Sequence, residues 1–199
     1  MSIFDKYDLH DVDETFKMPD KPPQGLTLVV GTSGSGKSTI LRNWGMKAIQ
    51  RDSITPIYKL FKSEDECESL LMSCGLRSIP CWRRSLSQLS NGERHRAEIA
   101  LGMSNGETMF DEFSSVVDRN TARSLSIAMR KHYDRHGMES MVIATCHMDV
   151  EDWLTPDNIY NTDQQEWVIK KASGFDLLFH LESNPPQSKI GFVSKSITI

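Results

Sequence analysis

A glycine-rich segment near the N-terminus has the residue types and spacing of a phosphate-binding loop. Its G-x-x-x-x-G-K-S pattern begins at Gly31 and ends with Lys37 and Ser38. Glycines let successive backbone N–H groups turn toward an anion where a side chain would collide. The lysine can reach the β- and γ-phosphates of a nucleoside triphosphate, and the serine hydroxyl can bind Mg²⁺. The candidate binding residues are Gly31, Thr32, Ser33, Gly34, Ser35, Gly36, Lys37, Ser38 and Thr39.

Two expected elements position this loop. The apolar run 26–30 predicts a strand before it, and the apolar positions from Ile40 to Ile49 predict a helix that runs to about Gln50. The N-terminus of that helix would present free N–H groups and its positive dipole end to the same anion. A flexible Gly/Ser linker requires neither element. The pattern therefore predicts binding of a nucleoside triphosphate.

A second helix N-terminus has a similar character. A helical run over 94–101 follows a segment headed by a serine and containing a glycine, which can present a hydroxyl and backbone N–H groups to an anion. The segment consists of Leu89, Ser90, Asn91, Gly92 and Glu93. If both segments contact one triphosphate, we expect the second to come from another subunit.

Paired carboxylates end a third predicted element. The segment 107–118 fits a strand that ends in the carboxylates of Asp111 and Glu112. A helix is expected over 121–136. An aspartate at a strand end suits Mg²⁺ binding together with Ser38, while the adjacent glutamate could polarise an attacking water. The alternative is an acidic turn without a chemical role.

The apolar run 141–145 predicts a buried parallel strand, and it delivers Cys146 and His147 to its carboxyl end. Ligands collect at this edge of open α/β sheets. A lone histidine is usually structural, but its position after a core strand makes His147 a candidate γ-phosphate contact.

Other elements are predicted from local pattern. Strands are expected at 14–18, 55–61 and within 152–160, followed by a turn at 161–165 and a hairpin partner at 166–170. A serine-headed capping box at Ser63 opens a helix that ends near Gly75. Three aromatic residues are alternatives for stacking on a nucleotide base, or for plain packing: Phe4, Tyr7 and Phe16.

Length and composition indicate one domain. The chain has 199 residues and a net charge of -4, so no global basic field indicates nucleic acid. It has no apolar run of membrane-spanning length and no signal-peptide core, so we expect no membrane insertion and a cytoplasmic location. The cysteines lack metal-site or disulfide spacing and are expected to be buried or incidental thiols: Cys67, Cys74, Cys81 and Cys146. Within residues 1–199 we expect an N-terminal edge segment at 1–25, a nucleotide-binding core at 25–165 and a terminal segment at 166–199.

In this order, the motifs resemble those of ATP-binding cassette (ABC) ATPases. The segment 31–39 is similar to Walker A and 108–112 to Walker B, while 115–118 is similar to the D-loop and 145–147 to the switch histidine. The segment 89–93 resembles the LSGGQ signature, with Asn91 and Glu93 as departures. The resemblance implies an α/β P-loop NTPase fold, with a mostly parallel sheet flanked by helices and, because the insertion before the signature is short, a reduced helical subdomain.

The resemblance also implies an activity and roles for residues. It implies hydrolysis of ATP, with Mg²⁺, in a head-to-tail homodimer that sandwiches two ATP molecules between Walker A of one chain and the signature of the other. By this likeness Glu112 would be the general base, with Lys37 and His147 at the γ-phosphate, Ser38 and Asp111 at Mg²⁺, and Asp118 in communication between subunits. No glutamine stands where the family has its Q-loop, although Lys59 and Lys62 lie near that place.

A narrower likeness covers 74–82, 89–97 and 144–157, which look similar to soluble microbial and phage cassettes fused to acetyltransferase-like domains. It implies a stand-alone cassette that acts on a protein partner or on DNA. Basic residues that could contact nucleic acid flank the signature and follow the D-loop: Arg94, His95, Arg96, Arg119, Arg123, Arg130, Lys131 and Arg135. The alternatives are the nucleotide-binding subunit of a membrane transporter and a small P-loop kinase for a nucleoside or base.

Overall fold

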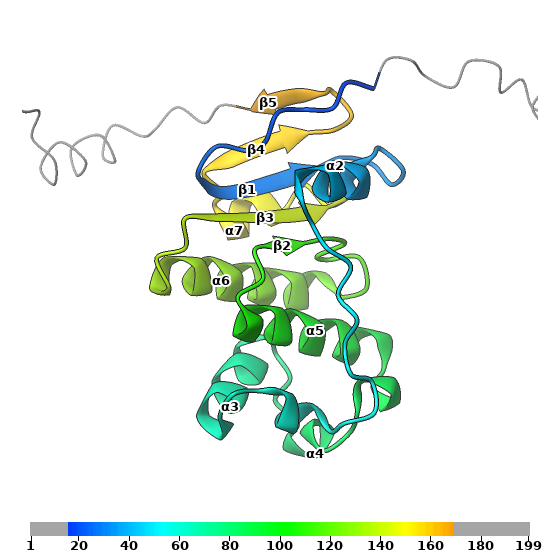
Figure 1. Ribbon diagram of the computed structural model, residues 1–199, viewed down its shortest axis with the longest axis vertical. Helices are drawn as coiled ribbons and strands as arrows, with labels where there is room; N and C mark the ends of the chain where they lie inside the picture. The colour runs from blue at the N-terminus through cyan, green and yellow to red at the C-terminus, as the bar shows by residue number, and fades with distance from the viewer. Residues whose placement is uncertain (1–15, 169–199) are drawn as a thin grey trace, which may run out of the picture. The chain divides into compact units, whose positions relative to one another are not determined.

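The computed structural model describes residues 16–168. Within this part of the chain, five strands form one sheet in the order β2-β3-β1-β4-β5 (Figure 1). The strands are β1 (Gly25–Val30), β2 (Met109–Phe110), β3 (Ser140–Thr145), β4 (Asn158–Asn161) and β5 (Glu166–Val168). The first four in the sheet order are parallel, and β5 pairs antiparallel with β4 as the predicted hairpin. The predicted α/β class with a mostly parallel sheet is confirmed.

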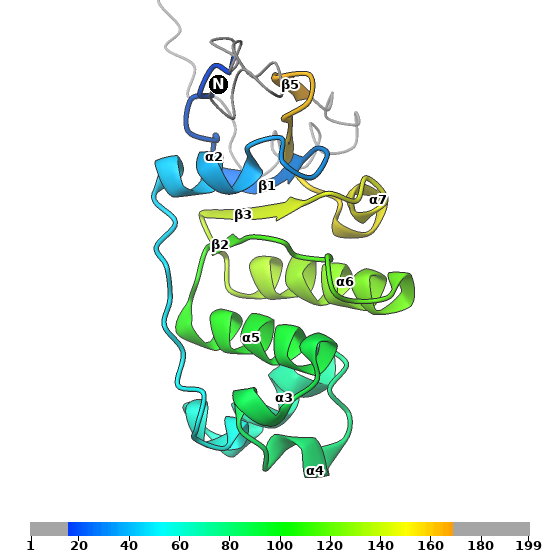
Figure 2. The same cartoon turned by 90° about the vertical axis from the view of Figure 1, so that its right-hand side faces the viewer.

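Helices cover both faces of this sheet. They are α2 (Lys37–Trp44), α3 (Glu64–Ser73), α4 (Ile79–Trp82), α5 (Asn91–Asn105), α6 (Arg119–Arg135) and α7 (Val150–Leu154), with 3₁₀ turns η1 (Ile57–Leu60) and η2 (Leu86–Gln88). Because side chains alternate along a strand, Val29 packs with α2 while Leu28 and Val30 pack in the larger core on the other face. Figure 2 shows α2 and α6 on opposite sides of β3. The central strands are buried on both faces, which explains their continuous apolar sequences.

A helical layer lies beyond α5. The segment between α2 and η1 runs from the sheet to this layer, which contains α3 and α4 (Figures 1 and 2). Leu71 and Leu86 of this layer belong to the larger core, together with Ala97 of α5. Half of the predicted capping box of α3 is present: the Ser63 side chain accepts a hydrogen bond from the Glu66 N–H at 3.1 Å, but the Glu66 side chain accepts from the Lys62 N–H and not from that of Ser63.

Several predicted boundaries are wrong. The helix after the glycine-rich loop ends at Trp44 and not near Gln50, because Gly45 adopts a φ of 114° and its N–H bonds back to the Arg42 carbonyl. The strand expected at 55–61 is the 3₁₀ turn η1 with one isolated bridge, Pro56 to Ser85. That segment lies in the helical layer, so its β-branched and aromatic residues have no sheet to join.

Three further elements differ from expectation at their bounds. The helix expected from residue 94 begins at Asn91, since Ser90 is its N-cap. The segment 152–160 contains the end of α7 before β4 begins at Asn158. Residues 16–18 of the expected edge strand are not in a strand, and residues 14 and 15 lie outside the described residues, as do Phe4, Tyr7 and the terminal segment from 169 onward.

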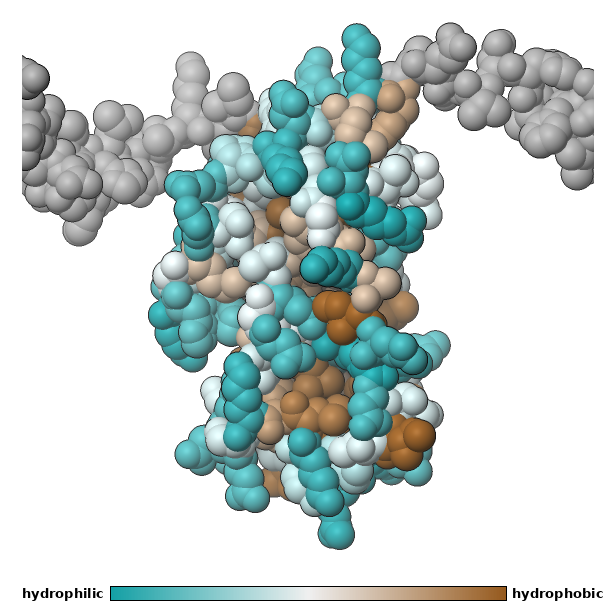
Figure 3. All heavy atoms as spheres, in the orientation of Figure 1, coloured by the Kyte–Doolittle hydropathy of each residue, from teal (hydrophilic) through white to brown (hydrophobic). Residues whose placement is uncertain are grey.

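The surface in Figure 3 is mostly hydrophilic, and hydrophobic side chains reach it mainly in the lower, helical layer. In residues 16–168, every helix is too short or too polar to cross a bilayer. Cys67, Cys74 and Cys81 are buried as expected, and burial raises the pKa of the Cys74 thiol to about 12. We therefore assign these thiols to packing.

Candidate functional site

The carboxyl ends of three parallel strands bring the candidate residues to one edge of the sheet. Val30 pairs with Thr145, and Phe110 pairs with Ile143 two positions before the end of β3. The glycine-rich loop therefore follows β1, Asp111 and Glu112 follow β2, and His147 follows β3, on adjacent strands. This edge is where open parallel sheets bind their ligands.

The glycine-rich loop needs glycine at defined positions. Gly34 and Gly36 have φ values of 85° and 91°, in the left-handed region that favours glycine. At Gly31 a Cβ atom would stand 1.9 Å from the Thr162 hydroxyl oxygen, so a side chain cannot fit there without displacing Thr162. The backbone conformation thus depends on both local glycine geometry and a residue from a distant element.

Lys37 lies folded over the loop that precedes it. Its side chain is buried, and Nζ donates hydrogen bonds to the carbonyl oxygens of Gly31, at 2.8 Å, and Thr32, at 2.6 Å. A buried ammonium group is costly unless it is hydrogen-bonded, and these carbonyls satisfy two of its three donors. The arrangement holds a positive charge against the loop, which suits an anionic ligand.

The turn between β4 and β5 supports the loop from its other side. The Asp163 carboxylate accepts hydrogen bonds from the Thr32 N–H at 2.9 Å and the Thr32 hydroxyl at 2.8 Å. Thr162 Oγ1 lies 2.5 Å from Ser35 Oγ and donates to the Val30 carbonyl at 3.1 Å. Sequence reasoning assigned these residues only to a turn, because nothing local indicates a partner so far away in the chain.

A hollow of about 500 Å³ opens over the loop and includes Phe16, Gly36, Asp163 and Gln165 in its lining. The Phe16 ring lies close against the loop, with two of its carbons 3.1 Å from where a Gly36 Cβ would stand. Of the three aromatic residues proposed to stack on a base, Phe16 is therefore the one that the described structure brings to the loop.

The carboxylate pair follows β2 directly. Asp111 Oδ1 accepts a hydrogen bond from the Glu112 N–H at 2.9 Å, and Glu112 is exposed with a φ of 51°. A glutamate in the left-handed region is uncommon and such strain gathers at functional sites. The oxygen donors of Asp111 and Ser38 fit Mg²⁺, which prefers hard ligands and retains several waters. Among residues 16–168, no cluster of three or more His, Cys, Asp or Glu side chains forms a metal site by itself.

The segment 89–93 forms the N-terminus of α5 and is capped by its own glutamate. Glu93 Oε2 accepts hydrogen bonds from the Ser90 N–H at 3.0 Å and the Ser90 hydroxyl at 2.8 Å, and the Glu93 N–H bonds to Ser90 Oγ at 3.4 Å. Hydrogen bonds from the Ser90 backbone and side chain lower the pKa of Glu93. The expected anion-binding end of this helix therefore already holds a carboxylate.

The segment also lies against the loop that follows the carboxylates. His95 Nε2 lies 2.8 Å from the Phe113 carbonyl oxygen, and Gly92 packs beside the Val116 carbonyl. At the end of that loop, Asp118 caps α6, accepting hydrogen bonds from the Thr121 N–H at 3.0 Å and hydroxyl at 2.6 Å. Within the described residues, no hydrogen bond joins 89–93 to the glycine-rich loop of the same chain.

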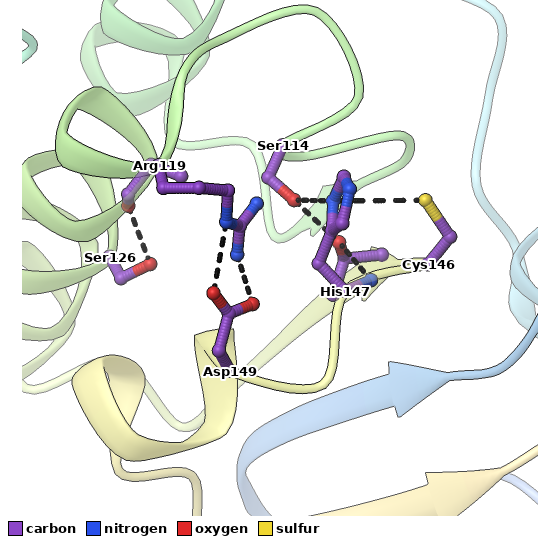
Figure 4. A network of polar contacts seen from close by, with 8 residues as sticks. Ser114, Arg119, Ser126, Cys146, His147 and Asp149 are labelled. Carbon is purple, nitrogen blue, oxygen red and sulfur yellow. Dashed lines mark hydrogen bonds and ion pairs between the residues drawn. The ribbon is translucent and has the colours of Figure 1, made fainter.

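His147 belongs to a buried polar network that Figure 4 shows from close by. Its Nδ1 lies 2.8 Å from Ser114 Oγ, and Ser114 Oγ lies 2.7 Å from Thr145 Oγ1. Nearby, Arg119 at the start of α6 forms an ion pair with Asp149 before α7. The loop after β2 and the loop after β3 are thus tied together, and sequence reasoning selected His147 and Arg119 but gave no role to their partners Ser114 and Asp149.

Neither lysine near the expected Q-loop position reaches the sheet edge. Lys62 Nζ donates a hydrogen bond to the Ser104 carbonyl near the end of α5, and the Lys59 ammonium lies 5.8 Å from the Tyr58 ring centroid. A separate hollow of about 320 Å³ adjoins Asp111 and is lined in part by Lys47, Arg51 and His95. Within the described residues, Lys59 and Lys62 therefore do not take the place of the missing glutamine.

Solved structures of ABC cassettes have the same fold as this chain. An archaeal ribosome recycling factor, aABCE1, solved with the ribosomal stalk protein aP1, aligns with a TM-score of 0.56 and 18% identity over 71% of this chain and 37% of that one. The cassette MJ0796, solved as a dimer in a post-hydrolysis state with ADP and Pi, aligns with a TM-score of 0.56 and 15% identity over 72% and 83% of the two chains. The RNase-L inhibitor aligns with a TM-score of 0.56 and 18% identity, covering 71% and 37%.

These alignments show that the chain shares the α/β fold of ABC-type P-loop NTPases, as predicted. The chain spans only 37% of the length of the aligned ribosome recycling factor. No protein-family model and no curated protein matches the sequence. At 15–18% identity the likeness shows the fold, and the chemistry must be argued from the site.

Proposed function

We propose that this protein is an ABC-type ATPase that binds and hydrolyses ATP, with Mg²⁺, between two head-to-tail copies. The observation that carries the proposal is the meeting of the glycine-rich loop, the Asp111–Glu112 pair and His147 on three adjacent strand ends. Each supplies a different function to one phosphoryl-transfer site: phosphate binding, activation of water and contact to the γ-phosphate.

Each group of residues in the site has its own proposed role in the reaction. The N–H groups of 31–39 and the Lys37 ammonium bind the phosphates, and Lys37 exchanges its loop carbonyls for phosphate oxygens. Ser38 and Asp111 would hold Mg²⁺, which neutralises charge on the phosphates when bound. Glu112, exposed beside them, orients and deprotonates the attacking water, while His147 and Lys37 stabilise charge that develops on the γ-phosphate.

The second subunit completes the site. In the part of the chain that the structure describes, the segment 89–93 has no hydrogen bond to the glycine-rich loop, so its hydroxyl and N–H groups are proposed to contact the ATP of a partner copy. The MJ0796 cassette, solved as a dimer, supports this arrangement by its fold. Asp118 ends the loop that contains Val116, and the Val116 carbonyl lies beside Gly92. Asp118 is proposed to communicate the state of one site to the other. Loss of the bridging phosphate contacts after hydrolysis opens the dimer.

The test is the solution mass of the Glu112→Gln variant with and without ATP and Mg²⁺. Slow hydrolysis should accumulate the ATP-bound dimer, and adding Ser90→Arg should abolish it because a large cation blocks the second subunit's contact. Glu139→Gln, which changes a carboxylate at the opposite end of β3, is the matched control and should stay monomeric after hydrolysing its ATP. Monomers under every condition, with activity that survives Ser90→Arg, would favour the small P-loop kinase.

A cytoplasmic switch that acts on a partner is the biological role we propose, in line with the resemblance to soluble microbial and phage cassettes that occur fused to acetyltransferase-like domains. The missing Q-loop glutamine and the reduced helical layer disfavour a transporter subunit. One feature favours the transporter alternative. It is a hollow of about 380 Å³ in that layer, lined in part by the apolar side chains of Tyr58, Ile79 and Trp82, where a partner could dock. Co-purification with a membrane protein, lost on Ile79→Asp, would support the transporter alternative.

Binding to DNA is the other partner hypothesis, and much of its basic charge is already engaged locally. Arg94 pairs with Glu98, Arg96 donates to the Gly75 carbonyl, and Arg130 pairs with Asp134 and Asp157. Arg123, Lys131 and Arg135 remain exposed along α6. Binding of duplex DNA that weakens with salt, and that weakens again on Lys131→Gln, would support the hypothesis.

A further inference from the structure

The hydroxyl of Ser114 lies between the two loops of the proposed site and contacts His147. Ser114 follows Glu112 by two positions, is fully buried and lies 2.8 Å from His147 Nδ1. Thr145, the last residue of β3, is also buried, and its hydroxyl oxygen lies 2.7 Å from Ser114 Oγ. Figure 4 shows the serine and the histidine ring facing each other.

The hydrogen bonds of this network have a preferred donor-to-acceptor direction. Thr145 Oγ1 accepts a hydrogen bond from the His147 N–H at 3.2 Å, so it is already an acceptor. Within residues 16–168, the one acceptor in hydrogen-bond contact with the Thr145 hydroxyl proton is Ser114 Oγ. If Thr145 donates to Ser114, the serine proton must go to its remaining neighbour, His147 Nδ1.

The opposite direction leaves a buried proton without a partner. If Nδ1 carried the imidazole proton and donated to Ser114, the serine would donate to Thr145, and the threonine proton would have no acceptor among the described residues. An unsatisfied buried hydroxyl is unfavourable, so the network favours the first arrangement. The Cys146 thiol, 3.7 Å from Nδ1, is a weak donor and points to the same assignment.

We infer that Ser114 and Thr145 are positioning residues that hold His147 as the neutral tautomer with its proton on Nε2. A histidine ring has one donor and one acceptor nitrogen when neutral, and the partner of one nitrogen sets the state of the other. With Nδ1 held as an acceptor, Nε2 presents N–H as a donor. This inference deepens the proposed function, on which its catalytic part rests: the donor is aimed at the γ-phosphate before ATP binds.

The same contact couples the two loops. Ser114 lies on the loop that carries Glu112 at its start, so a shift of that loop moves the hydroxyl that orients the histidine. The Arg119–Asp149 ion pair, with Arg119 also 5.3 Å from the Trp153 ring centroid, joins the far ends of the same two loops. The loop that carries the proposed water-activating Glu112 is therefore linked to the proposed γ-phosphate contact, His147, through a buried hydroxyl.

The experiment is ¹⁵N NMR of the full chain labelled at histidine, without nucleotide, at neutral pH. The protein has 6 histidines, and His147→Gln identifies the His147 signals by their loss. We expect wild-type His147 to show a protonated Nε2 and an Nδ1 shifted as a hydrogen-bond acceptor. Ser114→Ala should move the Nδ1 signal toward that of an imidazole nitrogen without a donor. Thr145→Ser should leave the wild-type pattern in place because it keeps the hydroxyl at position 145.

Two further variants separate positioning from packing. Ser114→Cys keeps nearly the same size but replaces the hydroxyl with a weak donor, so it should shift Nδ1 in the same direction as Ser114→Ala. Ser126→Ala is the matched control, since Ser126 is equally buried but bonds only to the Ala122 carbonyl within α6, at 2.8 Å. It should leave the His147 signals as they are.

The kinetic readout follows from the same contact. Ser114→Ala should lower kcat for ATP about tenfold, equivalent to the loss of one well-placed hydrogen bond, with less than about a twofold change in KM. A proton on Nδ1 in the wild type, or His147 signals unchanged by both Ser114 variants, would overturn the inference. If the wild type neither binds nor hydrolyses ATP, the proposed function fails, while the NMR result still decides the direction of the network.

Discussion

The Asp163 carboxylate accepts hydrogen bonds from both the N–H and the hydroxyl of Thr32, a residue 131 positions earlier in the chain. These bonds attach the β4–β5 turn to the start of the glycine-rich loop. Thr162 adds its contact with Ser35 and fills the space beside Gly31. The loop is therefore supported before any ligand arrives, which reduces the ordering cost of binding.

Weakening this support should weaken nucleotide binding. Asp163→Asn keeps the shape but replaces one acceptor oxygen with an NH₂ donor that faces the donors of Thr32. We expect the Kd for ATP to rise about tenfold, since a charge-assisted hydrogen bond is lost. Isothermal titration calorimetry, in which ATP is added to each protein, measures this change in Kd.

The matched control for Asp163 is Asp52→Asn. Asp52 caps the N–H groups of Ile54 and Thr55 and the Thr55 hydroxyl in the same way, at 2.8, 3.0 and 2.6 Å, but lies in the segment between α2 and η1. Its variant should bind ATP like the wild type. Equal affinities for all three proteins would show that the turn does not support the loop.

Glu93 is expected to oppose closure of the dimer. Its carboxylate accepts hydrogen bonds from the Ser90 hydroxyl and N–H, the groups proposed to contact the partner's γ-phosphate, and these hydrogen bonds lower the pKa of Glu93 and so favour its charged form. An approaching phosphate meets a negative charge and must displace it. Glu93→Gln should therefore strengthen the ATP-bound dimer about threefold to tenfold.

Sedimentation in the Glu112→Gln background, over a series of protein concentrations, measures that dimer affinity. Glu98→Gln is the matched control because it removes a carboxylate further along α5 that pairs with Arg94. Only the change at position 93 should tighten the dimer. A weaker dimer for Glu93→Gln would mean that the glutamate contributes to the contact and does not compete with it.

The sequence predicted the parts of the site that have local signals. The glycine-rich loop, the strand–carboxylate pattern and the buried strand before His147 are each visible in a short window, and the parallel sheet brings them together. The supports could not be predicted in this way. Asp163, Thr162 and Ser114 act through partners from distant segments, and an aspartate in a turn or a serine after a glutamate has no distinctive pattern.

The two wrongly predicted elements have different physical reasons. Residues 55–61 have strand propensity, but tertiary context places them in the helical layer, where Ile57 is buried in the main core. Helix α2 ends at Trp44 because Gly45, in the left-handed region, terminates it, although apolar positions continue to Ile49. Tertiary context therefore decided the first case and a local glycine the second.

Phe16 should contribute to binding of nucleosides but not of bare phosphates. Its ring lies beside Gly36 at the edge of the hollow over the loop. Stacking of a base on an aromatic ring is worth about 1–3 kcal/mol, so Phe16→Ala should weaken ATP binding about tenfold or more, and Phe16→Trp should retain it. Titration with a fluorescent ATP analogue measures this effect.

Inorganic triphosphate distinguishes stacking from distortion of the loop. Phe16→Ala should bind it as tightly as the wild type, because the phosphate contacts come from 31–39. Met18→Ala, which changes another exposed apolar residue of the same segment, is the control for general effects. Equal losses for ATP and triphosphate would assign Phe16 to support of the loop.

His132 should make the stability of the fold depend on pH. The residue is 9% exposed near the end of α6, and burial, with the nearby charges of His136 and Arg135, lowers its pKa to about 4. Above about pH 6.5 the group is neutral in both the folded and unfolded chain and contributes nothing. As the pH falls from 6.5 toward 4, only the unfolded chain binds the proton, so the free energy of unfolding decreases.

At pH 5.5 this one group should lower the free energy of unfolding by about 1.4 kcal/mol relative to pH 7.5. Urea denaturation of the wild type and of His132→Gln at both pH values isolates the contribution as the difference between their pH dependences. His136→Gln should reduce this pH dependence, because the nearby charge of His136, whose ring centroid lies 4.4 Å from that of His132, contributes to lowering the pKa of His132. If His132→Gln loses as much stability as the wild type on acidification, protonation of His132 is not what destabilises the fold.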